Sequence, residues 1–156
     1  MNHVRRLTLA RAAVLATTPL LMIDTQANPA PPAELRSVQP EARLVGTGAL
    51  RFFGLRVYEA RLWAPPGFQP EAYARHPLAL ELTYDRKLEG EAIAERSVAE
   101  MRRVGAFSEE QAQRWLALMK QAFPDVAAQD RLVGLHDGRG EVRFFHNGRL
   151  TARIGD

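Results

Sequence analysis

Two apolar, strand-like runs joined by a turn signal constrain the fold of this chain more than any other feature. The first run begins at Arg43 and the second ends at Ala64, and both are rich in Leu, Val, Phe, Tyr and Trp. Phe53-Gly54 lies between them, and a glycine at this point favours the tight turn of an antiparallel hairpin. The stretch is therefore predicted to be a β-hairpin that turns at Gly54.

The length of the loop decides which side chains of this hairpin share a face of the sheet. If the loop has two or four residues, Arg51 lies opposite Arg56 and diagonal to Tyr58. Side chains alternate between the two faces of a strand, so all three would then point to one face. A three-residue loop would break this parity. The simpler alternative is a half-buried hairpin whose arginines only reach solvent.

The middle of the chain predicts one strand followed by two helices. Apolar and polar residues alternate over 78–84, which is typical of a strand with one buried face. Apolar residues at helical spacing predict amphipathic helices over 90–104 and 109–123. Gly105 is expected to end the first helix in a left-handed conformation, and Ser108 to cap the second.

The end of the chain returns to strands. Short strands are predicted at 132–136, 141–146 and 149–154, the last two joined by a tight turn at Asn147-Gly148. The chain therefore has strands first, then two helices, then strands again, and this order of elements is typical of the α+β class. It predicts an antiparallel sheet with helices packed on one face, that is, an open-faced β-sandwich.

The N-terminal segment has the three parts of a secretory signal peptide. Arg5 and Arg6 give a positive start, residues 12–23 are mostly apolar, and Thr25-Gln26-Ala27 places small residues before a cleavage site. The apolar run is shorter than the ~20 residues of a membrane-spanning helix. We therefore expect residues 1–27 to be cleaved after Ala27 and the mature protein to be periplasmic or secreted. The arginine pair leaves both the general secretory and the twin-arginine routes open.

Cleavage would leave a proline-rich tether, 28–34, and one domain, 35–156. It would remove three arginines and one aspartate, so the formal net charge would fall from +3 to +1. This charge does not indicate a nucleic-acid partner, and no basic cluster with interleaved aromatic residues argues for one. The chain has no cysteine, which excludes thiol catalysis and cysteine-ligated metal sites.

Other catalytic and metal-binding patterns have little support. His136 and His146 could meet at the ends of neighbouring strands, but two ligands without a clear third make a poor metal site. None of the serines stands in a nucleophile elbow, and Gly46-x-Gly48 lacks the third glycine and the helix of a phosphate-binding loop. We therefore expect no metal, no cofactor and no catalytic residue.

A set of short motifs runs in order through roughly 35–156. They are Gly46-x-Gly48-x-x-Arg51, Val57-Tyr58-x-Ala60-x-Leu62-Trp63, Tyr84-Asp85-Arg86, Glu100-Met101-Arg102-Arg103, Phe123-Pro124-Asp125-Val126, Asp130-Arg131-Leu132 and Phe144-Phe145-His146-Asn147-Gly148. Together they resemble the chalcone isomerase-like domains of bacterial envelope proteins. The resemblance implies the chalcone isomerase fold, in which helices lie over a large antiparallel sheet.

The resemblance also implies a ligand-binding site on the hairpin. Arg51 aligns with the arginine that holds the substrate phenolate or enolate in isomerases of this fold, and Tyr58 stands where they carry a catalytic threonine. The fatty-acid-binding members hold the lipid carboxylate with an arginine and a tyrosine on the same hairpin, and Arg51 with Tyr58 resembles that pair. A guanidinium fork and a phenol hydroxyl both suit an anionic head group.

The function expected on these grounds is non-catalytic binding of a small amphipathic anion, such as a fatty acid, by an exported domain. Two alternatives stay open: an intramolecular lyase of the chalcone isomerase type that acts on a phenolic substrate, and an interaction domain that docks on an envelope protein. The sequence departs from the family pattern in a tighter hairpin than in the plant proteins. The sequence also ends at Asp156, before the helical segment that follows the last strand in bacterial relatives, so we expect either that one side of the pocket is open or that the sequence is truncated.

Overall fold

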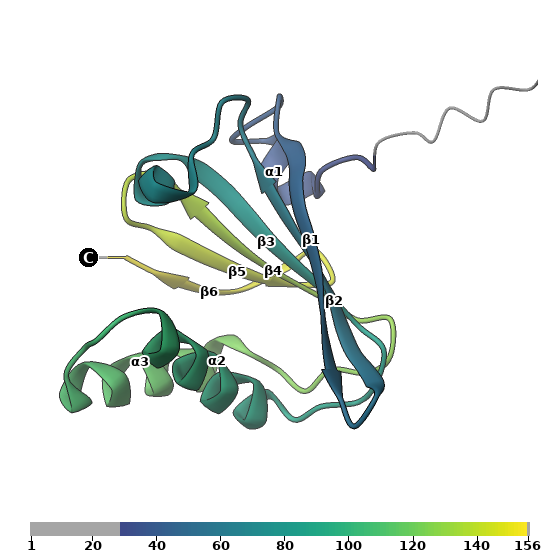
Figure 1. The fold of residues 1–156 in the computed structure, drawn as a ribbon, viewed down its shortest axis with the longest axis vertical. Helices are drawn as coiled ribbons and strands as arrows, with labels where there is room; N and C mark the ends of the chain where they lie inside the picture. The colour runs from purple at the N-terminus through teal and green to yellow at the C-terminus, as the bar shows by residue number, and fades with distance from the viewer. Residues whose placement is uncertain (1–28, 156) are drawn as a thin grey trace, which may run out of the picture.

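Six antiparallel strands form one sheet, and their order in space is their order along the chain (Figure 1). The computed structural model of the protein describes residues 29–155, so the predicted signal peptide and its cleavage after Ala27 lie outside the described residues. The strands are β1 Arg43–Phe52, β2 Leu55–Ala64, β3 Pro77–Tyr84, β4 Arg131–Asp137, β5 Val142–His146 and β6 Arg149–Ile154.

Both predicted tight turns are present. Phe53 and Gly54 alone separate β1 from β2, with φ values of 47° and 77°. Asn147 and Gly148 separate β5 from β6 in the same way, with φ values of 49° and 83°. Two successive positive φ values match the right-handed twist of the strands, which is why such turns join hairpins. The predicted turn at Gly54 is therefore confirmed, and its loop, whose length the sequence left open, has two residues.

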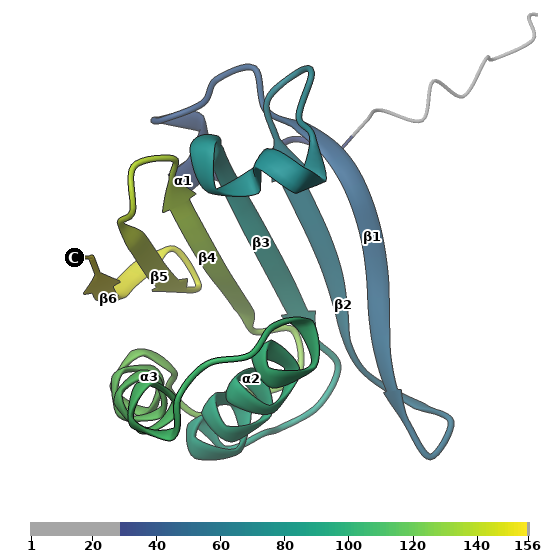
Figure 2. The same cartoon turned by 60° about the vertical axis from the view of Figure 1, so that its left-hand side comes forward.

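Two long helices, α2 Gly90–Val104 and α3 Glu109–Ala122, lie in the connection between β3 and β4 and pack across one face of the sheet (Figure 2). The side chain of Ser108 accepts a hydrogen bond of 3.1 Å from the Gln111 N–H, which confirms the predicted cap of α3. The prediction for Gly105 was wrong: its φ of −157° is extended backbone rather than left-handed. A short 3-10 helix, Pro70–Arg75, connects β2 to β3.

Successive residues of the central strands build apolar clusters on opposite faces of the sheet. The cluster on the α2 side contains Tyr84, Ile93, Val126 and Leu132. The cluster on the other side contains Leu35, Ala42, Trp63, Ala79, Val133 and Leu135. Because Ala79 and Tyr84 belong to the same strand but to different clusters, β3 carries both cores at once.

A one-turn helix, α1 Ala33–Arg36, closes the second cluster and begins inside the predicted tether of 28–34. Its Leu35 is fully buried. Glu34 accepts a hydrogen bond of 2.9 Å from the Arg131 guanidinium on β4. Burial and this ion pair hold the end of the tether against the sheet, which the proline content of the segment could not reveal.

These layers confirm the predicted α+β class: an open antiparallel sheet with its two long helices on one face. Within residues 29–155, the helices are all too short or too polar to span a membrane.

The contact between the start of α2 and the end of α3 gives a test of the helix packing. A Cβ added at Gly90 would lie 2.0 Å from the Phe123 carbonyl oxygen, and the Gly90 N–H donates to Asp125 Oδ1 at 2.9 Å. Gly90→Ala should therefore lower the free energy of unfolding by about 2 kcal/mol or more, because backbone must move. The control is Gly105→Ala, where a Cβ meets open space; it should change stability by less than about 0.5 kcal/mol in urea unfolding. Equal effects of the two substitutions would contradict this packing.

Asp130 allows a test of how the stability of the fold depends on pH. It accepts hydrogen bonds from the Ala127 N–H at 2.8 Å and from Asn147 Nδ2 at 2.9 Å, and these lower the pKa of its carboxyl, the first more than the second. A lowered pKa in the folded state stabilises the protein above the unfolded-state value of about 4. That stabilisation is lost as the pH falls from about 4 through the lowered pKa.

The stability difference between pH 7 and about pH 3 should therefore be smaller in Asp130→Asn than in the wild type. Urea unfolding at both pH values measures it. An unchanged difference would mean that other carboxyl groups carry the acid sensitivity.

Candidate functional site

An open apolar cavity of about 570 Å³ lies between the sheet and α2. Its floor includes Ala60 of β2 with Leu80 and Leu82 of β3, and α2 contributes Ala92 and Ile93. Leu80 is 44% exposed although it lies on the floor, so solvent reaches well into the cavity. The size is within the range of small-molecule sites in proteins.

A second hollow of about 170 Å³ adjoins the first and extends toward α3. The two share Leu80, Leu82, Tyr84, Ile93 and Ser97. The new walls are mainly apolar and include Met119, Phe123 and Phe144. The two hollows together form one elongated apolar space along the helix-covered face of the sheet.

Two tyrosines lie in this cavity side by side. Tyr58 and Tyr84 are paired across β2 and β3, and their rings meet edge to face at 5.7 Å between centroids. Burial raises the pKa of both hydroxyls. Both hydroxyls are therefore protonated at neutral pH, so they can donate a hydrogen bond to an anion but are poor proton acceptors.

Arg51 lines the same cavity as Tyr58, at its exposed edge. Its predicted position opposite Arg56 is confirmed, but a register shift follows between Leu50 and Arg51, so that Leu50 pairs with Tyr58. Val57 is the extra residue on β2 at this point. A bulge of this kind interrupts the alternation of side chains that the prediction assumed.

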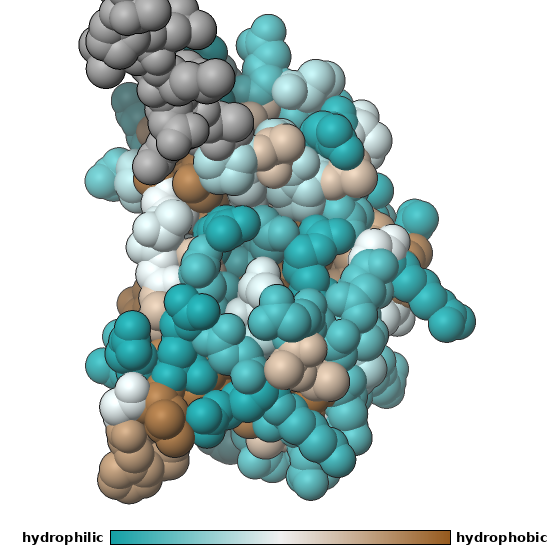
Figure 3. All heavy atoms as spheres, turned by 90° about the vertical axis from the view of Figure 1, so that its right-hand side faces the viewer, coloured by the Kyte–Doolittle hydropathy of each residue, from teal (hydrophilic) through white to brown (hydrophobic). Residues whose placement is uncertain are grey.

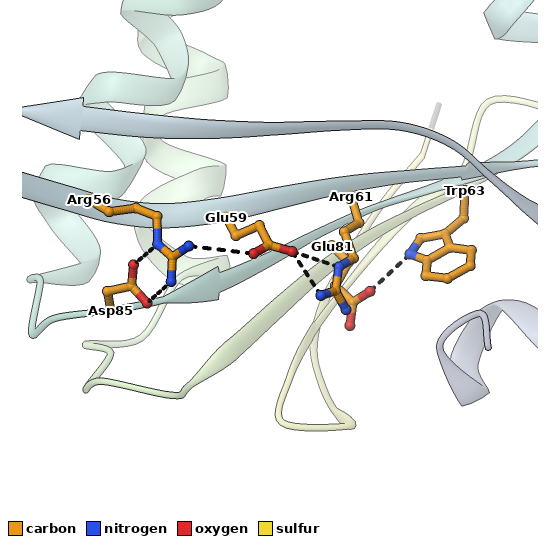
Figure 4. A network of polar contacts seen from close by, with 6 residues as sticks. All are labelled: Arg56, Glu59, Arg61, Trp63, Glu81 and Asp85. Atoms are coloured by element: carbon orange, nitrogen blue, oxygen red, sulfur yellow. Dashed lines mark hydrogen bonds and ion pairs between the residues drawn. The ribbon is translucent and has the colours of Figure 1, made fainter. Parts of the chain in front are cut away.

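Arg56 points away from the cavity, and Arg51, its direct partner, reaches only the cavity edge, so the prediction that Arg51, Arg56 and Tyr58 share one face was wrong. The Arg56 guanidinium holds the Asp85 carboxylate through two hydrogen bonds, and it lies 3.7 Å from the Glu59 carboxylate (Figure 4). Glu59 belongs to the opposite face from its neighbours Tyr58 and Ala60, which line the cavity. The hydrogen bond from Arg56 lowers the pKa of Asp85, so this pair is charged and satisfied without a ligand.

Arg86 also lines the cavity, although no role was predicted for it from the sequence. Arg86 as a whole is half-buried, but its Nε is fully buried and makes no hydrogen bond within residues 29–155. A buried guanidinium nitrogen without a partner is uncommon, because losing hydration without a new hydrogen bond costs free energy. The only sequence signal was the motif Tyr84-Asp85-Arg86 at the end of the alternating strand.

The polar groups that α2 brings to the cavity already have partners. Arg96 forms an ion pair of 2.5 Å with Glu100, one turn later on the same helix. The Ser97 hydroxyl donates to the Ile93 carbonyl oxygen at 2.8 Å. Neither side chain needs a ligand for its polar group, in contrast to Arg86.

The arrangement suits the binding of an anion with an apolar body better than it suits acid–base chemistry. Arg51 and Arg86 supply positive charge, the tyrosines supply hydrogen-bond donors, and the long walls are apolar. The carboxylate that lines the cavity, Glu100, is held by Arg96 and Arg103. Among residues 29–155, no three His, Cys, Asp or Glu side chains lie together as metal ligands would.

Comparison with known proteins identifies the fold. The sequence matches no family model and no curated protein. The crystal structure of a fatty-acid binding protein from Arabidopsis thaliana matches with a TM-score of 0.56 and 15% sequence identity, over 74% of this chain and 74% of the plant protein. At this identity the match establishes the architecture. The protein therefore has the chalcone isomerase-like fold that its motifs predicted.

Proposed function

We propose that the protein is an exported, non-catalytic binding protein for a small amphipathic anion such as a fatty acid. The observation that carries this proposal is the buried Nε of Arg86, a residue that lines the apolar cavity, because this atom makes no hydrogen bond within residues 29–155. A carboxylate would provide that acceptor. It would also neutralise a charge that is costly to keep unpaired in apolar surroundings.

The walls of the cavity account for the apolar part of the ligand. Leu82 and Ile93 border both hollows, and the second hollow continues past Met119 and Phe123. An acyl chain placed along this path would bury its methylene groups, each of which contributes about 0.8 kcal/mol. A ligand with one anionic end and a flexible apolar chain therefore fits better than a compact polar metabolite.

The tyrosines support binding rather than isomerisation. An isomerase needs a group that takes or gives a proton near neutral pH, and burial moves the pKa of Tyr58 and Tyr84 further from that range. As neutral donors, the same hydroxyls can hold a carboxylate oxygen. The plant neighbour, which is named a fatty-acid binding protein, supports the same class of ligand.

Titration with palmitic acid and with hexadecanol tests the proposal. The two probes share an apolar chain, but only the acid is anionic. We expect saturable binding of one palmitate per chain, and much weaker binding of the alcohol, by isothermal titration calorimetry. Equal binding of both would show that the arginines do not recognise the head group, and binding of neither would refute the proposal.

Arg86→Gln should weaken palmitate binding by about 2 kcal/mol, roughly 30-fold, because a desolvated charged partner is lost. The fold should be retained, since the Nε of Arg86 makes no hydrogen bond within residues 29–155 that the substitution could break. Arg75→Gln, at the exposed end of the 3-10 helix, is the matched control and should bind as the wild type does. If Arg86→Gln also binds as the wild type does, the head group lies elsewhere.

Tyr58→Phe should weaken binding by about 1 kcal/mol, the contribution of one neutral hydrogen bond. Arg51→Ala should have an effect of about 1 kcal/mol or less, because exposed charges are screened by water. Increasing salt should reduce the Arg51 contribution but leave the Tyr58 contribution nearly unchanged. A larger loss from Arg51→Ala than from Arg86→Gln would place the anion at the edge of the cavity instead of inside it.

A further inference from the structure

The tip of the β1–β2 hairpin carries large apolar side chains that nothing within residues 29–155 covers. Phe52, Phe53 and Leu55 are 65%, 89% and 55% exposed. The two phenyl rings contact each other edge to face, with centroids 4.5 Å apart. The hairpin extends past the neighbouring strands (Figures 1 and 2), and a space-filling view shows apolar atoms gathered at that end of a largely hydrophilic face (Figure 3).

The residue type at the tip is not explained by the turn itself. Asparagine, aspartate or glycine is favoured in both central positions of such a turn, because each needs a positive φ. Phe53 has a φ of 47°, a conformation that bulky side chains rarely adopt. The phenyl ring is almost fully exposed, so packing in the core does not offset this backbone strain.

One arginine lies on each side of the apolar tip. Arg51 and Arg56 flank it, and no acidic residue lies between Arg51 and Tyr58 in the sequence. Arg56 is paired with Asp85, whereas no ion pair of Arg51 is present within residues 29–155. Aromatic and aliphatic side chains at a tip with cations behind them are the pattern of segments that enter the surface of a bilayer. There the rings lie at the level of the head groups, and the cations meet lipid phosphates.

We propose that Phe52, Phe53 and Leu55 insert reversibly into the surface of a lipid bilayer that carries anionic phospholipids, with Arg51 against the head groups. Arg51 and Phe52 also line the cavity, so this orientation turns the cavity edge toward the bilayer. The insertion does not depend on what the cavity binds. It would hold even if the proposed fatty-acid function failed.

Cysteine labelling gives a local test, because the natural sequence has no cysteine. In the full chain, Phe53→Cys and, separately, Leu55→Cys are labelled with a nitrobenzoxadiazole fluorophore, whose emission rises and shifts to the blue in apolar surroundings. The Leu55 variant keeps both phenyl rings if the first variant folds poorly. The matched control is Val104→Cys at the end of α2, where an apolar residue that is 91% exposed also follows two arginines.

With vesicles of phosphatidylethanolamine and phosphatidylglycerol, we expect a several-fold rise and a blue shift at position 53 or 55, and little change at position 104. With neutral phosphatidylcholine the rise should be smaller, and Arg51→Gln should remove most of that difference between vesicles. The fluorophore reports its own surroundings, so vesicle binding by another segment would leave positions 53 and 55 in water.

Three outcomes would overturn the proposal. The first is an equal response, or none, at the tip and at position 104. The second is an apolar signal without vesicles that disappears on dilution, which would mean that a second copy of the chain covers the tip. The third is a tip that responds to a protein from the envelope fraction but not to vesicles.

Discussion

The whole arrangement depends on the alternation of side chains along β2 and β3. Because successive residues point to opposite faces, each strand must complete a compact core on one side and border an open cavity on the other. Trp63 and Ala79 face α1, whereas Tyr58 and Leu82 face α2. The core under α1 is tightly closed, with Trp63 Nε1 donating to Glu81 at 2.9 Å. That closed side holds the sheet in shape, so the cavity side does not need to be filled.

Local chemistry made much of this fold predictable from the sequence. The turns at Gly54 and Gly148 and the cap at Ser108 each depend on residues within a few positions of one another, and all three were predicted correctly. The bulge at Val57 was not predictable in this way. Its carbonyl oxygen accepts a hydrogen bond of 2.9 Å from the Asp85 N–H, far along the chain. A local sequence pattern cannot indicate that distant contact. The alternation of side chains along β2 therefore did not predict correctly which face Arg56 occupies.

The same limit explains why one candidate residue was found and another was missed. Arg51 is conspicuous in the sequence because it lies in a hairpin motif, yet its side chain is exposed. Arg86 follows a strand end and looks like an ordinary surface arginine. Its Nε is nevertheless buried in the folded protein, where the residue lines the cavity. Burial of a charged group is a property of tertiary packing. A buried charge without a partner is therefore found only by checking each charged side chain of the folded protein for its hydrogen bonds and ion pairs. Within residues 29–155, Arg56 and Arg96 have theirs, whereas the Nε of Arg86 has none.

Ligand binding in the cavity and insertion of the hairpin tip into a bilayer would involve some of the same residues. A fatty acid in a bilayer keeps its carboxylate among the head groups, and its chain cannot cross water without losing about 0.8 kcal/mol for each methylene that becomes hydrated. With the tip inserted, Phe52 would lie in the bilayer surface while it also borders the cavity. The chain could then pass along apolar side chains toward Leu80, and the carboxylate could pass from Arg51 at the edge to Arg86, which lines the same cavity. The two arginines would guide such a transfer, because Arg51 is exposed and would hold an anion weakly, whereas Arg86 has a buried Nε and would hold it more strongly.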